Sequence, residues 1–146
     1  VAATGALPRP AALARAAEAH AALVLFAPGP ANHEAALPHK LFEAMALGLP
    51  VVVAETCRPA AALVRHVRCG LVVDSADAHA VAAALDALAA DPAARARMGE
   101  AGRRALVTEC AWEQDAARLI ALHRRLARKG EAMRQEMRPA SRTPQR

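Results

Sequence analysis

The sequence has few aromatic residues and no long uninterrupted apolar segment. Its 146 residues include two Phe, one Trp and no Tyr. Because aromatic side chains provide the surfaces on which bases stack, their scarcity argues against nucleic-acid binding. No apolar run approaches the roughly 20 residues that a membrane-spanning helix requires, and the amino-terminal residues lack the charged-then-apolar pattern of a signal peptide. We therefore expect a soluble domain in the cytoplasm.

Cysteine is also scarce, and nothing in the sequence has the spacing of a metal site. Cys57, Cys69 and Cys110 match no zinc or redox pattern. None of the six histidines has another at the i, i+4 spacing of a helical zinc site. We expect reduced thiols, as in cytosolic proteins, and neither a metal ion nor a cofactor.

Positive charge is concentrated at the carboxyl-terminal end. Residues 118–146 contain nine Lys and Arg against two Asp and Glu, whereas residues 1–117 contain ten against twelve. Such a basic segment either forms a solvated helix face or contacts anionic headgroups peripherally at the inner membrane face. The sequence leaves both interpretations open.

Strand-like and helix-like segments alternate in the first half of the chain. The pattern predicts the end of a strand at Val1–Thr4, then strands over 22–26, 51–54 and 71–74 and helices over 10–20, 38–47 and 60–67. Short connections and apolar strands without alternation are typical of parallel sheets. We expect an α/β fold with a Rossmann-like parallel sheet and helices on both faces.

Beyond residue 74 the pattern predicts helices alone. Asp77 and Asp91, the latter followed by a proline, are helix start signals. A last helix is expected over 111–137, ended or kinked at Gly130. Its apolar residues are expected to pack inward; they are Leu119, Ile120, Leu122 and Leu126. The polar segment 138–146 is expected to be a disordered tail, after a first domain over 1–110.

One carboxylate, Glu43, lies in an otherwise apolar helix that the segment LPHKLFEAMALGLPVVVAE predicts. In parallel sheets ligands bind beyond the carboxyl ends of the strands, where this helix would begin. Free backbone N–H groups at His39 to Leu41 would seat a phosphate, Lys40 would add charge, and Glu43 would accept ribose hydroxyl groups. Alternatively, Lys40 and Glu43 form a surface i, i+3 ion pair.

The same segment also resembles a known family. Its pattern is P-x-K-L-F-E-A-M-A-x-G-x-P-V-V, over residues 38–52. The pattern is similar to the donor-binding half of the retaining GT-B glycosyltransferases, in the group called family four or glycosyl transferases group 1. Further similarity lies in Thr4-Gly5 and Leu7, in CGLVVDSADAHAVAAALDAL, in DPAARARMGEAGRR and in ECAWEQ. The resemblance thus covers residues 4–126.

The resemblance implies an incomplete carboxyl-terminal domain of a GT-B fold that binds a nucleotide-diphosphate sugar. The whole enzyme would transfer the sugar with retention to a glycan or lipid-linked acceptor, in polysaccharide or glycolipid assembly. By the family pattern, Glu43 contacts the donor ribose, Leu37, Pro38, His39 and Lys40 lie by the sugar and diphosphate, and the turn from Gly5 to Leu7 borders the base. No metal is required, and the pattern assigns no catalytic residue within this chain.

The sequence departs from the family pattern at two places. Many relatives carry a second Glu where this chain has Ala35, and a Gly pair followed by a Glu where it has TCRPAAAL. The chain also begins at Val1 within a strand pattern, so we expect a piece of a longer protein whose acceptor domain precedes it, inactive in transfer alone. Two alternatives are a non-catalytic nucleotide-binding or interaction subunit and a sugar-nucleotide epimerase of the GT-B fold.

Overall fold

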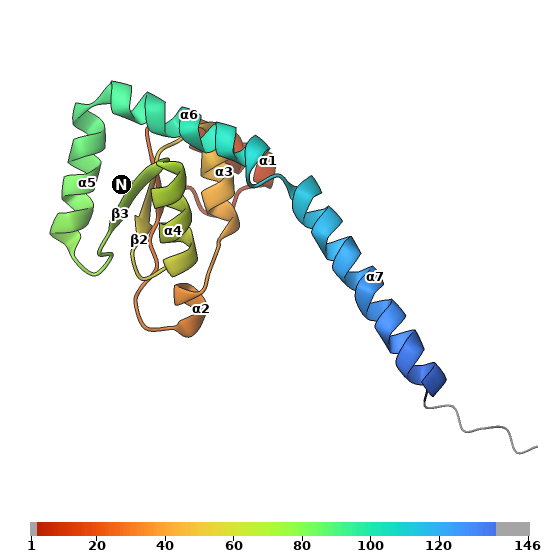
Figure 1. The fold of residues 1–146 in the computed structure, drawn as a ribbon. Helices are drawn as coiled ribbons and strands as arrows, with labels where there is room; N and C mark the ends of the chain where they lie inside the picture. The colour runs from red at the N-terminus through yellow and green to blue at the C-terminus, as the bar shows by residue number, and fades with distance from the viewer. Residues whose placement is uncertain (1–2, 137–146) are drawn as a thin grey trace, which may run out of the picture. The chain divides into compact units, whose positions relative to one another are not determined.

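The computed structural model describes residues 3–136, and the chain divides into two compact units, Val1–Glu109 and Cys110–Arg146 (Figure 1). The first unit contains α1 (Arg9–Ala17), β1 (Ala22–Val24), α2 (Ala31–Glu34), α3 (His39–Leu47), β2 (Val51–Ala54), α4 (Arg58–Val67), β3 (Gly70–Val73), α5 (Ala78–Ala90) and α6 (Pro92–Thr108). The second unit contains α7 (Trp112–Glu136).

The three strands form a parallel sheet in the order β1-β2-β3. Val51 of β2 pairs with Ala22 on one side and with Gly70 on the other. The carboxyl ends of the strands lie at the lower edge of the sheet in Figure 1, together with α2 and the first turns of α3 and α4. The parallel arrangement is confirmed, and it gathers the loops after the strands at one edge.

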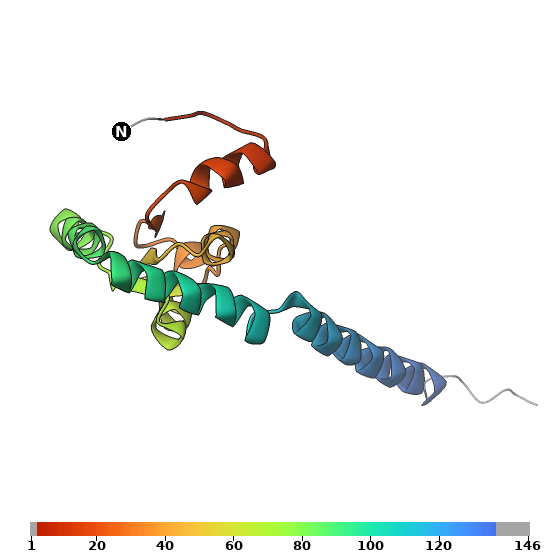
Figure 2. The same ribbon diagram turned by 90° about the horizontal axis from the view of Figure 1, so that it is seen from above.

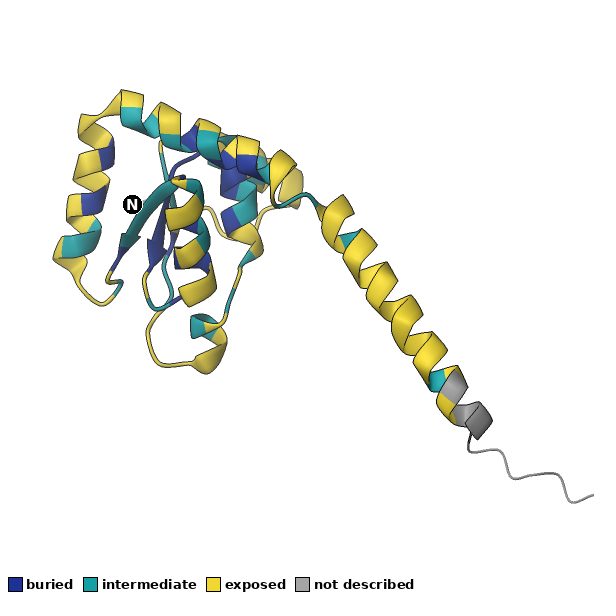
Figure 3. Cartoon of the chain, viewed as in Figure 1, coloured by how far each residue is buried: buried dark blue, intermediate teal, exposed yellow. Residues whose placement is uncertain are grey.

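Helices cover both faces of this sheet. All four residues of β2 are buried, and they contribute to two apolar clusters. Val51 and Val53 pack with residues of α3, α4 and α6 on one face, whereas Val52 packs with Ala84 and Leu88 of α5 on the other. Figure 3 shows buried positions on the strands and on the sides of the helices that face them. The predicted α/β fold with helices on both faces is confirmed.

The carboxyl-terminal end of α3 packs against α6, which runs beside it in the view from above (Figure 2). Gly48 ends α3 with a φ of 71°, a backbone conformation that glycine adopts without strain. Gly99 of α6 lies so close that a Cβ there would be 2.0 Å from the Gly48 carbonyl oxygen. Arg103 donates a hydrogen bond to the Leu47 carbonyl at 2.9 Å. The position of α3 is therefore set by helix packing.

The helix start signals in the sequence predicted helices α4, α5 and α6 correctly, with small shifts in their bounds. Asp77 and Asp91 accept hydrogen bonds from the N–H groups of His79 and Ala94, each at 2.8 Å, and so cap α5 and α6 as expected. Helix α4 begins two residues before the expected position, because Pro59 fits its first turn.

Three predictions about the elements were wrong. Residues 3 and 4 are not in a strand, and no strand of the described chain lies beyond β1 to pair with them. The segment between the expected strand over 22–26 and the expected helix over 38–47, for which no element was predicted, contains the single turn α2, which follows Pro30 and is too short to show a periodic pattern. Helix α7 continues through Gly130, because one glycine costs a helix only about 1 kcal/mol.

The described residues do not show the expected inward packing of α7. Its large apolar side chains are exposed: Trp112, Leu119, Ile120, Leu122, Leu126 and Met133. The unit that contains α7 has no second helix or sheet among its described residues against which this face could be buried. The expected tail, 138–146, lies outside the described residues.

Candidate functional site

Glu43 is held by an arginine from another helix. Arg9, the first residue of α1, donates from Nε at 3.1 Å and from Nη2 at 3.0 Å to the same carboxylate oxygen, Oε1. The Glu43 side chain is 35% exposed and that of Arg9 is 76% exposed. The alternative ion pair between Lys40 and Glu43 is not formed among the described residues. Glu43 therefore lies at the surface with a cation beside it.

Lys40 contacts an aromatic ring instead of Glu43. Its Nζ lies 4.8 Å from the centroid of the Phe26 ring, within the range of a cation–π interaction. The Phe26 ring also packs against the His33 ring, with centroids 5.0 Å apart. Since Phe26 follows β1 and Lys40 is in the first turn of α3, this cluster places a cation at the carboxyl edge of the sheet.

The first turn of α3 offers two of the three backbone donors that the sequence predicted. The Leu41 N–H donates to the Pro38 carbonyl at 3.0 Å, so that donor is not free. The N–H groups of His39 and Lys40 precede the first intrahelical bonds, and no acceptor in the described chain takes them. Two N–H groups and the partial positive charge of the helix start remain for an anion.

A cavity of about 250 Å³ lies between α1 and α3. Lys40 and Glu43 contribute its polar side chains, and α1, α3 and nearby residues contribute an apolar wall: Ala12, Leu13, Ala16, Ala22, Ala44, Leu47 and Leu49. The structure thus brings two of the predicted site residues to one cavity. The sequence pattern did not indicate that α1 would form the opposite wall.

The other predicted site residues lie outside this lining. Gly5 has a φ of 67° and precedes, with the exposed Leu7, the helix whose first residue contacts Glu43. Leu37 is exposed, and Pro38 takes the position before the first residue of α3. His39 is exposed at the helix start. Their assignment to the donor stays a prediction.

The loop before α3 is tied to the turn after β2, where the sequence departs from the family pattern. The Cys57 thiol is buried and donates to the Ala36 carbonyl at 3.2 Å. Arg58 forms an ion pair with Glu34 of α2, with 3.4 Å between Nη2 and Oε2. The residues that replace the Gly pair and the Glu of relatives therefore hold the loop that leads into the candidate site.

A larger groove of about 400 Å³ lies between β1 and α5, away from the predicted residues. Its wall is mainly apolar, and Arg95 within it already donates to the carbonyls of Leu88 and Ala89.

Among residues 3–136 no group of three His, Cys, Asp or Glu side chains is arranged to hold a metal ion. In the same range, none of the helices combines the length and apolar character needed to cross a bilayer.

Comparison with known proteins identifies the class. The model of the family described as glycosyl transferases group 1 matches residues 10–105, and the chain belongs to this family. A sucrose-phosphate synthase from Thermosynechococcus elongatus has a similar structure, with a TM-score of 0.55 and 30% sequence identity over 64% of this chain and 23% of that one. The chain thus spans less than a quarter of that relative. No curated protein matches the sequence.

Together these findings define the fold as a partial GT-B Rossmann-like domain. The family match begins one residue after Arg9. The contact of Arg9 with Glu43 joins residues 34 positions apart, and the sequence carries no local signal for such a pair.

Proposed function

We propose that this chain supplies the donor-binding half of a glycosyltransferase, which transfers a sugar with retention from a nucleotide-diphosphate donor to a glycan or lipid-linked acceptor. The observation that carries the proposal is Glu43, which lies on the wall of a cavity beside Lys40 in a chain of the glycosyl transferases group 1 family. The acceptor would be held by another domain of the whole protein.

The geometry supports separate places for the nucleoside and the diphosphate of the donor. The cavity of about 250 Å³ is smaller than the roughly 300 to 1,000 Å³ of sites that enclose a whole drug-sized ligand, so we assign it the nucleoside. Glu43 would accept hydroxyl groups of the ribose. The diphosphate would lie at the start of α3, near the Lys40 ammonium group and the two free N–H groups. These donors would stabilise the leaving diphosphate without a metal.

The role of Lys40 is tested by comparing a nucleoside diphosphate with its monophosphate. We expect the chain to bind UDP, GDP or ADP, and Lys40→Ala to weaken that binding about threefold to tenfold, because one charge-assisted contact is lost. Binding of the monophosphate should change less. The measurement is isothermal titration calorimetry, with Arg65→Ala on α4 as the control. An unchanged affinity for the diphosphate would remove Lys40 from the proposed site.

We also propose that α7 contacts the inner face of the membrane. Trp112, Leu119, Leu126 and Met133 recur every seven residues and are exposed. At about 3.6 residues per turn, they share one face of the helix, and the basic residues lie along its flank and on the opposite side. These basic residues are Arg118, Arg124, Arg125, Arg128 and Lys129. A helix with an apolar face and a basic face fits the surface of an anionic bilayer.

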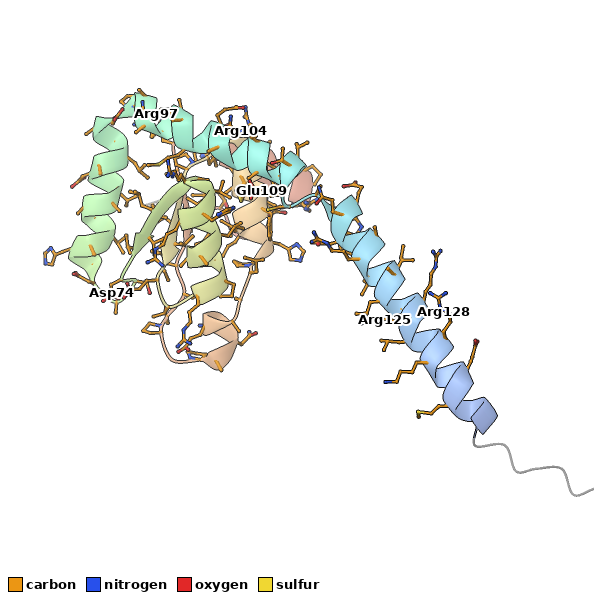
Figure 4. All side chains as sticks on the ribbon, in the orientation of Figure 1. Asp74, Arg97, Arg104, Glu109, Arg125 and Arg128 are labelled. Atoms are coloured by element: carbon orange, nitrogen blue, oxygen red, sulfur yellow. The ribbon has the colours of Figure 1, made fainter. Side chains whose placement is uncertain are left out.

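The membrane proposal is tested with vesicles. We expect the chain to co-sediment with vesicles that contain phosphatidylglycerol and to remain free with phosphatidylcholine alone. Arg125→Gln should lower the affinity about fivefold, since a basic residue near an anionic surface contributes about 1 kcal/mol. Arg97→Gln, on α6, is the control (Figure 4). Equal binding to both kinds of vesicle, or none to either, would contradict the proposal.

A further inference from the structure

The ion pair between Arg9 and Glu43 leaves part of each charged group available. Both hydrogen bonds from Arg9 end on Oε1 of Glu43, and Oε2 accepts none from the described residues. A guanidinium group has five N–H donors, and two of the Arg9 donors are used in this contact. The pair therefore presents an open acceptor beside open donors.

The pair also connects two segments that both border the cavity. Arg9 begins α1, whose residues Leu13 and Ala16 line one wall, and Glu43 lies on α3, which lines the other. The contact spans 34 positions of sequence and is made by an arginine whose side chain is mostly exposed. Burial of Arg9 in an apolar core therefore does not explain why it contacts this carboxylate.

We propose that Arg9 is a positioning residue for nucleotide binding, which rests on the function proposed above. Arg9 holds Oε1 and so fixes the side chain of Glu43, while Oε2 stays open to accept a ribose hydroxyl group. A glutamate that is fixed before the ligand arrives loses less rotamer freedom when it binds. Arg9 thereby raises the affinity for a nucleoside diphosphate through Glu43.

The opposite role would follow if the ribose needed both carboxylate oxygens. Arg9 would then compete with the ligand for Oε1, and its removal would strengthen binding. The open Oε2 favours the positioning role, because a hydroxyl group can donate to it while the ion pair stays intact. The two roles predict opposite changes in affinity when Arg9 is replaced.

The test measures the affinity of UDP, GDP and ADP for the full chain by isothermal titration calorimetry, and then uses the one that binds best. We expect Arg9→Ala to weaken binding about twofold to tenfold, the equivalent of one rotamer-rich side chain no longer fixed. Arg9→Lys should recover part of the loss, since an ammonium group can still donate to Oε1. The matched control is Arg15→Ala on the same helix, which removes an exposed ion pair with Glu18 at 3.2 Å and should leave binding unchanged.

A double-mutant cycle separates positioning from direct contact with the ligand. Arg9→Ala should have no further effect in the Glu43→Ala background, because nothing remains for it to position. An equal loss in both backgrounds, or an unchanged or stronger affinity of the single variant, would overturn the proposal. If Arg9→Ala is without effect but Glu43→Ala abolishes binding, the positioning role of Arg9 is contradicted and the donor site is not. If none of the three diphosphates binds the wild-type chain, or if Glu43→Ala binds them like wild type, both the proposed donor site and the role of Arg9 are contradicted.

Discussion

Glu43→Ala should weaken the binding of a nucleoside diphosphate by at least tenfold. A hydrogen bond from a ribose hydroxyl group to a carboxylate contributes about 1.5 to 3 kcal/mol, which corresponds to about 10-fold to 150-fold in affinity. The carboxylate lies on the wall of the cavity and is only 35% exposed. Water that fills its place in the variant therefore does not restore the whole binding free energy. The affinity is measured by calorimetric titration of UDP, GDP and ADP.

The matched control for this experiment is Glu100→Ala, an exposed carboxylate on α6 outside the cavity lining. It removes the same charge from the chain and should leave affinity within twofold of wild type, on the order of the small effect of a distant surface charge. In the whole enzyme, Glu43→Ala should lower kcat/KM for the donor by at least the same factor. Wild-type donor kinetics in that variant would contradict the assignment of Glu43 to the ribose. Binding of the diphosphate without any transfer by the whole protein would instead favour a non-catalytic nucleotide-binding subunit.

Gly99→Ala should destabilise the first unit by about 3 kcal/mol, the upper range for overpacking. The added Cβ would lie 2.0 Å from the Gly48 carbonyl oxygen, whereas carbon–oxygen contacts in proteins lie at about 3.3 to 3.6 Å. The neighbouring atom belongs to the backbone and cannot rotate away, so α6 must move from α3. We expect the midpoint of thermal unfolding, followed by circular dichroism, to fall by about 10 °C.

Gly130→Ala provides the control for the glycine substitution. Gly130 is also within a helix, but a Cβ there would meet no atom within 4 Å. This variant should gain helical stability of up to about 1 kcal/mol, because alanine is the better helix former. Equal stability of the two variants would show that the close approach of α6 to α3 is not rigid.

Elements whose signals are local were predictable from the sequence. Strand β2 matches its expected bounds, Val51–Ala54, because Pro50 precedes an apolar run and Glu55 follows it. Helices α5 and α6 start at aspartates whose carboxylates cap neighbouring N–H groups. These signals depend on residues a few positions apart, so a single sequence contains all the information they need.

The remaining features depend on contacts between distant parts of the chain. The predicted Lys40 and Glu43 do line one cavity, but their partners, Phe26 and Arg9, come from other elements and could not be chosen from spacing. The exposure of Leu119 could not be predicted either, because an apolar face shows that a helix can be buried without showing what covers it.

The contacts of Cys57 and Arg58 with the loop before α3 have a consequence for chimeric enzymes. If the segment 27–36 were exchanged for that of another glycosyltransferase while TCRP remained, Arg58 would lose Glu34 and the orientation of the incoming loop would no longer be fixed at that point. The loop over 27–36 and the turn after β2 are joined by these two contacts and form one structural unit. A chimera that is to keep the orientation of this loop therefore has to exchange both segments together.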